Sequence, residues 1–159
     1  MTLVIRDMRD DDADAVALMV KGLARHIGTD FEPKVTGAAL IQSRDLIEVV
    51  VAEDGGQLLG ACLGLMTFST WRGSRGLYVV DLFVDEAARG QNIGLRLLRG
   101  AARRAARRGA TFIKLEVDES NGGAQRFYAR LGFAKKAEDR LHILEQDHLE
   151  NLIAVGEDT

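Results

Sequence analysis

Apolar side chains near the N-terminus recur with the spacing of a helix. Val16, Met19, Val20 and Leu23 stand three or four residues apart, which predicts a helix with one buried face. Residues 10–12, three aspartates in a row, precede this face. They predict where the helix begins, because carboxylates accept the unpaired N–H groups of a first turn.

The middle of the chain instead carries short apolar runs rich in β-branched residues, which predict strands. Two of these runs flank Asp54-Gly55-Gly56, a sequence typical of a hairpin turn. The last run is apolar throughout except for Asp81. The strands predicted in this way are residues 3–6, 46–53, 57–67 and 77–84.

Beyond residue 84 the pattern alternates between helix and strand. Gly109 and Gly132 each follow a helical stretch and predict its end. Strand–helix–strand order predicts a parallel pair with a right-handed crossover, whereas the earlier hairpin predicts antiparallel pairing. We therefore expect an α/β fold with a mixed sheet. The remaining elements expected are helices at residues 37–42, 92–108, 121–131 and 147–154, and strands at 112–117, 133–135 and 142–145.

Composition narrows the class of protein. The 159 residues fit a single domain at 1–159, and 47% hydrophobic with 28% charged residues is typical of a globular chain. A net charge of −3 argues against a nucleic-acid partner. Cys62, the only cysteine, excludes an intramolecular disulfide. Without a signal peptide or a long apolar run, we expect a cytoplasmic protein with no membrane partner, and the histidine spacing predicts no metal.

The junction between the strand ending at Val84 and the next helix has the features of an anion site. A helix start exposes unpaired N–H groups at the positive end of the helix dipole, which suits a pyrophosphate. Arg89 adds a positive charge, and Gly90 and Gly94 allow a ligand to approach the backbone. It is equally consistent that Gly90 only eases a turn and that Gly94 only permits helix–strand packing.

Two motifs in this half of the chain resemble those of the GNAT superfamily of N-acetyltransferases. Residues 89–94 are similar to its Arg/Gln-x-x-Gly-x-Gly/Ala loop, with Asn92 in place of the middle glycine. Asparagine tolerates positive φ better than other non-glycine residues, so we expect the loop to be kept. Residues 121–133 match Asn-x-x-Ala-x-x-Phe-Tyr-x-x-x-Gly-Phe at every fixed position.

This resemblance implies a fold, a cosubstrate and a catalytic acid. The fold would be a mixed, mostly antiparallel sheet, flanked by helices, whose parallel central strands splay apart to admit acetyl-CoA. Tyr128 would protonate the leaving thiolate, and a backbone N–H near Leu82 would stabilise the oxyanion. The resemblance also implies a homodimer. The residues implied for acetyl-CoA binding are Leu82, Phe83, Val84, Arg89, Gly90, Gln91, Asn92, Ile93, Gly94, Leu95, Asn121 and Tyr128.

Residues 69–84 resemble the diamine and polyamine branch of the superfamily, which includes thialysine acetyltransferases. That branch has Tyr-x-Glu-Asp-x-x-Val, but here Val80 replaces the glutamate and Asp81 is kept. Because adjacent strand residues point to opposite faces, we expect Asp81 not to reproduce the missing glutamate, and the substrate to carry fewer charges than spermine. Asp81 either acts on the substrate amine or accepts structural hydrogen bonds. Trp71 and Glu116 are the other candidates for substrate binding.

We therefore predict an acetyl-CoA-dependent N-acetyltransferase acting on the primary amine of a small molecule: a diamine, a polyamine or an amino-acid side chain. Transfer is expected to be direct, because Cys62 lies within a strand with no base beside it in sequence. Two alternatives remain open. One is an enzyme that acetylates a protein or peptide, and the other is a non-catalytic module that binds acyl-CoA.

Overall fold

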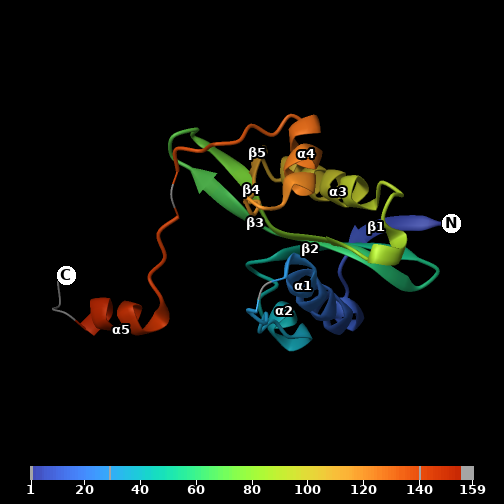
Figure 1. The fold of residues 1–159 in the computed structure, drawn as a ribbon, viewed down its shortest axis with the longest axis horizontal. Helices are drawn as coiled ribbons and strands as arrows, with labels where there is room; N and C mark the ends of the chain where they lie inside the picture. Colours follow the sequence, from blue (N-terminus) through green and yellow to red (C-terminus); the bar gives the residue numbers. More distant parts are fainter. Residues whose placement is uncertain (1, 29, 140, 155–159) are drawn as a thin grey trace. The chain divides into compact units, whose positions relative to one another are not determined.

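The computed structural model describes residues 2–28, 30–139 and 141–154 of the chain. These residues form two compact units, Met1–Glu116 and Val117–Thr159. The first unit holds a sheet and three α-helices, and the second holds two further helices (Figure 1).

The sheet of the first unit has five strands that lie side by side in chain order. Strands β1 to β4 pair with antiparallel neighbours, and β5 lies parallel to β4, as the alternating pattern predicted. The parallel pair lies at one end of the described sheet, whereas the family resemblance implied that it would be central. The strands are β1 (Leu3–Asp7), β2 (Glu48–Asp54), β3 (Gln57–Ser69), β4 (Ser74–Val84) and β5 (Ala110–Lys114).

Helices cover both faces of this sheet (Figure 1). On one face, Val16 and Leu40 from the first two helices pack with Val51 and Leu63 of the strands. On the other face the third helix lies so close that a Cβ added to Gly100 would be 2.6 Å from Ile5. Each fully buried aliphatic side chain contributes about 1.5–3 kcal/mol, so the sheet is stabilised from both sides. The helices are α1 (Ala13–Ile27), α2 (Gly37–Gln42) and α3 (Ile93–Arg107), with 3₁₀ turns at Asp10–Asp12 and Glu86–Ala88.

The second unit contains α4 (Gly122–Arg130) and α5 (Gln146–Ala154), close to the predicted helices. The strands predicted at residues 133–135 and 142–145 are wrong, because both segments are irregular in the structure. A short strand is stable only when it pairs, and the described part of this unit offers no strand as a partner.

An arginine on β1 joins three elements of the first unit. Arg6 donates to Glu53 of β2 at 2.5 Å and to Asp12, just before α1, at 2.6 and 3.1 Å. The Arg6 guanidinium holds the pKa of the Asp12 carboxyl below its usual value. This network fixes the start of α1 against the edge of the sheet.

We expect Asp12→Asn to lower the free energy of unfolding at neutral pH by about 1–3 kcal/mol, because charge-assisted bonds to Arg6 are lost. In the wild type this contribution is complete above the ordinary aspartate pKa near 4 and is lost as the pH falls through the lower folded-state value. Denaturant titrations from about pH 7 to pH 2 should show the difference between the two proteins shrinking in acid. A difference that stays constant with pH would contradict this account.

Candidate functional site

Half of β4 has a neighbouring strand on one side only. Its partner β3 runs along nearly its whole length, but β5 pairs with it only from Arg75 to Tyr78. Because β5 ends at Lys114, opposite Tyr78, residues 79–84 present an edge to which no described strand is bonded. Such an edge offers backbone N–H and C=O groups to any extended ligand that lies along it.

The direction of these backbone groups follows from one hydrogen bond. The N–H of Asp85 donates to the carbonyl of Leu59, just before β3 pairs with β4, at 2.8 Å. Successive N–H groups alternate along a strand, so those of Leu82 and Val84 point away from β3 and toward the open edge. In agreement, the Val84 carbonyl accepts from Arg89 Nε at 3.4 Å. The N–H of Leu82 therefore points to the open edge, and its role as an oxyanion donor stays a prediction.

The loop that follows β4 leaves the start of α3 without a cap. Gly90 has φ 86° and Asn92 has φ 58°, so asparagine adopts the left-handed conformation that the sequence predicted it would tolerate. Within the described part of the chain no side chain caps α3, and the first turn of this helix contains no acid. The N–H groups of Ile93, Gly94 and Leu95 precede the first helical bond, from Arg96 to Asn92, and converge at the positive end of the helix.

The two glycines of this loop have different physical roles. Gly90 is required by its backbone angle, because a side chain is strained at φ 86°. Gly94 has a helical position, and a Cβ added there would meet Val84 Cγ2 at 3.6 Å, an ordinary contact. Packing within the protein therefore does not demand glycine at 94.

A β-bulge sets which side chains of β4 face α1. Asp81 pairs with Leu63 and Val79 pairs with Gly64, so Val80 is an extra residue in β4. Leu63 belongs to the core cluster on the α1 face, and Asp81 shares that face with it. Tyr78 pairs with Leu65, two residues beyond Leu63 on β3, and so lies on the same face as Asp81. The strict alternation expected from the sequence is therefore wrong at Val80.

Asp81 lies half-buried without a partner. No hydrogen bond or ion pair joins its carboxylate to another of the residues that the structure describes. Burial raises the pKa of this carboxyl. Burial, with a smaller contribution from the Asp81 charge, also raises the pKa of the Cys62 thiol to about 12. The contacts of the described residues therefore give Asp81 no role as a structural acceptor for the backbone, and a role toward the substrate stays a prediction.

Where β4 and β5 stop pairing, the structure shows a cluster of polar side chains, of which the sequence predicted only one member. The Tyr78 hydroxyl donates to the Glu116 carboxylate at 2.7 Å, which raises the pKa of Tyr78 to about 12. The Lys114 ammonium lies 4.9 Å from the centre of the Tyr78 ring. The sequence analysis named Glu116 as a candidate for substrate binding, but not Tyr78 or Lys114. Tyr78 could have been found there, because it is the first residue of the Tyr-x-Glu-Asp motif that contains Asp81.

Trp71 lies far from these groups within the first unit. It is in the turn between β3 and β4, and its side chain is fully exposed. Asp81 is seven residues beyond Ser74, the first residue of β4, which corresponds to about 23 Å of strand. The structure therefore does not bring Trp71 and Asp81 of one chain together.

The remaining candidates, Asn121 and Tyr128, belong to the second unit. Asn121 Oδ1 accepts from the N–H of Ala124 at 3.1 Å and so begins α4, as predicted. At the other end, the N–H of Phe133 donates to the carbonyl of Tyr128 at 3.1 Å around Gly132, which has φ 96°. This Schellman motif brings the Phe133 ring to 5.3 Å from the Tyr128 ring and limits how the tyrosine can turn. Their roles toward acetyl-CoA stay predictions.

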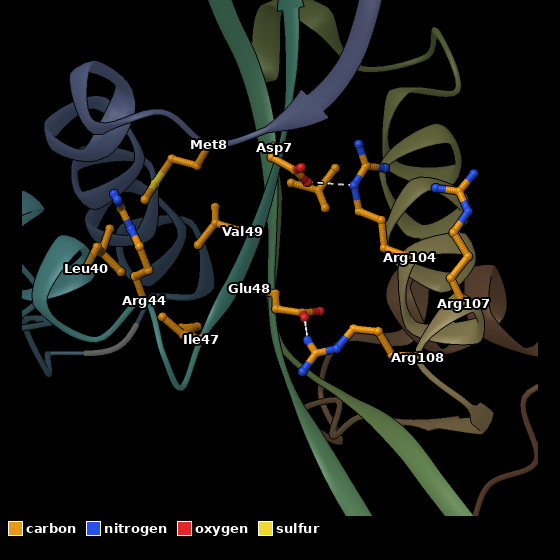
Figure 2. A pocket seen from close by; sticks show the side chains of 11 residues that line it. Asp7, Met8, Leu40, Arg44, Ile47, Glu48, Val49, Arg104, Arg107 and Arg108 are labelled. Carbon is orange, nitrogen blue, oxygen red and sulfur yellow. Dashed lines mark hydrogen bonds and ion pairs between the residues drawn. The ribbon is translucent and has the colours of Figure 1, made fainter.

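A separate pocket of about 480 Å³ lies at the other end of α3 (Figure 2). Two of the four arginines that line it are paired with its two acids, Arg104 with Asp7 at 2.6 Å and Arg108 with Glu48. The 15 residues of α3 separate it from the uncapped helix start by about 20 Å. It is therefore not part of the candidate site.

In the ranges 2–28, 30–139 and 141–154, no group of three His, Cys, Asp or Glu side chains could hold a metal ion. None of the helices in these ranges is long and apolar enough to cross a membrane.

Comparison with known proteins shows the family to which the chain belongs. The model of the Acetyltransferase (GNAT) family matches residues 21–133, so the chain belongs to this family and is an N-acetyltransferase. The thialysine N-epsilon-acetyltransferase of Mus musculus is 28% identical over 140 residues, which are 80% of this chain and 82% of that protein.

Two other relatives extend this comparison. An acetyltransferase of Agrobacterium fabrum is 33% identical over 138 residues and 85% of each chain. The solved structure of an integron cassette protein from the mobile metagenome of V. cholerae has a TM-score of 0.77 and 23% identity, covering 97% of this chain and 99% of that one. The last likeness confirms the fold.

We expect Asp81→Asn to raise the free energy of unfolding at neutral pH by about 1 kcal/mol, or roughly 2–4 °C in Tm, because an unpaired carboxylate is half-buried in the wild type. Its raised pKa means that the penalty is complete above the folded-state pKa and vanishes as the pH falls to the ordinary value near 4. Thermal melts of both proteins between about pH 4 and pH 7 test this. A variant less stable than the wild type at pH 7 would show that Asp81 makes stabilising bonds.

Proposed function

We propose that this protein transfers the acetyl group of acetyl-CoA directly to the primary amine of a small molecule. The observation that carries the proposal is the open edge of β4 at residues 79–84, with the uncapped start of α3 at one end and Asp81 on the α1 face. A group held along this edge can be reached by an amine from the face on which Asp81 lies.

The backbone of the first unit suits the cosubstrate. Free N–H groups at Ile93 to Leu95, with Arg89 beside them, would bind the pyrophosphate. The amides of the pantetheine arm would pair with the open edge as a further strand does. The N–H of Leu82 would then donate to the thioester oxygen as negative charge develops on it.

Asp81 and Tyr128 divide the proton transfers. Only the neutral amine attacks, and a carboxylate whose pKa is raised by burial can take the proton from the ammonium, directly or through water. Tyr128 would protonate the sulfur as the carbon–sulfur bond breaks. Its ring makes edge-on contacts with Phe127 at 5.1 Å and Phe133 at 5.3 Å, which restrict how the tyrosine can turn within its unit.

The state of Cys62 supports direct transfer. Its thiol is buried on β3, and its pKa is raised to about 12, so almost no thiolate exists at neutral pH. A covalent acetyl-cysteine would need that thiolate as the nucleophile. The mass of the protein should therefore stay unchanged during incubation with acetyl-CoA alone.

We expect Gly94→Glu to abolish measurable binding of acetyl-CoA, because a carboxylate would stand beside the anion site at the start of α3. Gly94→Ala is the matched control, since its Cβ makes only an ordinary contact with Val84. Isothermal titration calorimetry should show a loss of at least about 100-fold for glutamate and a small change for alanine. Equal affinity in wild type and Gly94→Glu would place acetyl-CoA elsewhere.

We expect Tyr128→Phe to lower kcat by about 10²–10⁴-fold, because the variant keeps the ring contacts and loses the proton. Acetyl-CoA affinity should stay nearly unchanged. The measurement is CoA release over a panel of diamines, polyamines, amino acids and peptides. Wild-type kcat in the variant would remove Tyr128 from the mechanism.

The same panel tests the function itself. Turnover limited to peptides would favour a protein acetyltransferase. Tight binding of acetyl-CoA with no release on any amine would indicate a non-catalytic module.

A further inference from the structure

We propose that Glu116 and Lys114, both in contact with Tyr78, form a subsite for the ammonium and carboxylate of an amino acid whose side-chain amine is acetylated near Asp81. This inference rests on the proposed function. In this proposal the cluster beside β4 binds the end of the acceptor that is not acetylated.

The first support is the position of the cluster. Tyr78 and Asp81 lie on the same face of β4 because Val80 is an extra residue in the strand. Three strand residues span about 10 Å, and a bulge shortens this distance. An acceptor held at its far end by the Tyr78 cluster could therefore extend its reactive amine toward Asp81.

The second support is that the charges of the cluster are not used elsewhere in the protein. Among the residues that the structure describes, neither Lys114 nor Glu116 takes part in an ion pair, although they are two residues apart. Each contacts Tyr78 instead. A carboxylate offers about four lone-pair sites, and the Tyr78 hydroxyl uses one of them, so Glu116 can still accept from an ammonium.

The third support is the sign of these charges. A diamine or polyamine carries only positive charge at neutral pH, so its far end would be attracted by Glu116 and repelled by Lys114. An α-amino acid presents an ammonium and a carboxylate on one carbon and satisfies both side chains. The cluster therefore favours an amino acid over the amine that results from its decarboxylation.

The bond from Tyr78 gives it a positioning role. It fixes the carboxylate of Glu116, which follows the end of β5, against β4. Without this bond, Glu116 would have to be ordered by the substrate itself, and binding would weaken without a change in the chemical step.

The test compares lysine with cadaverine, which differ only by the carboxylate. We expect wild-type kcat/KM to be about tenfold or more higher for lysine. Lys114→Met should lower kcat/KM for lysine about tenfold through KM and leave cadaverine unchanged or improved. Glu116→Gln should raise KM for both amines. Arg107→Met is the control for a lost surface cation, because Arg107 lies near the far end of α3. This variant should leave kcat/KM unchanged for both lysine and cadaverine.

Tyr78→Phe tests the positioning role. It should raise KM for both amines with kcat within about twofold, and it should have no further effect in the Glu116→Gln background, since the two residues act as a unit. An additive effect in the double variant would show that Tyr78 acts independently of Glu116.

The outcomes separate the two proposals. The subsite is wrong and the proposed function stands if amines are acetylated but kcat/KM for cadaverine equals or exceeds that for lysine. The same holds if Lys114→Met changes kcat/KM equally for the two amines. If no amine is acetylated although calorimetry shows bound acetyl-CoA, the proposed function fails and the subsite fails with it.

Discussion

The candidate site depends on one constraint, which is that β4 and β5 stop pairing halfway along β4. The two strands are bonded only as far as Tyr78 and Lys114, and beyond this point β4 has one neighbour, β3, among the strands that the structure describes. A strand with one free edge inside a helix-covered sheet is a liability unless something pairs with it. Here the free edge leads to a helix start that is also without a cap. The N–H groups along the free edge of β4 and those at the start of α3 are adjacent in the chain. Together they suit one elongated, anionic ligand.

The site also illustrates a conflict between stability and chemistry. Asp81 is half-buried with no partner among the residues described, whereas Arg6, Asp12 and Glu53 at the other side of the sheet satisfy one another. A carboxylate with a structural role is expected to be paired, as Asp12 and Glu53 are with Arg6. A carboxylate that must take up a proton is better left unpaired and partly buried, because desolvation raises its affinity for that proton.

Much of the fold followed from local pattern. Residues near Asn121 and Gly132 predicted both ends of α4, because caps and left-handed glycines act within a few residues. Asn92 took the backbone angle expected of it for the same reason. The strands predicted at 133–135 and 142–145 failed, because pairing is a non-local property that a short apolar run cannot reveal.

The site could be predicted only in part. The loop from Arg89 was visible as a glycine-containing junction between a strand and a helix, and Asp81 was visible as the only charge in an apolar strand. The Tyr78–Glu116 bond was not, because it joins residues 38 positions apart on two strands. Nor was the bulge, which depends on the register with Leu63 and Gly64 and not on the identity of Val80.

That bulge makes position 80 unlike its neighbours on β4. Val80 is nearly half exposed, and its side chain can differ between relatives without disturbing its neighbours. A one-residue deletion here would remove the bulge and leave Tyr78 and Asp81 two residues apart, so both side chains would stay on the same face of the sheet. A deletion at a paired position elsewhere in β4 would instead shift the register of the strand by one residue and turn part of it over. Position 80 should therefore be the one place in this strand that is open to deletion as well as to substitution.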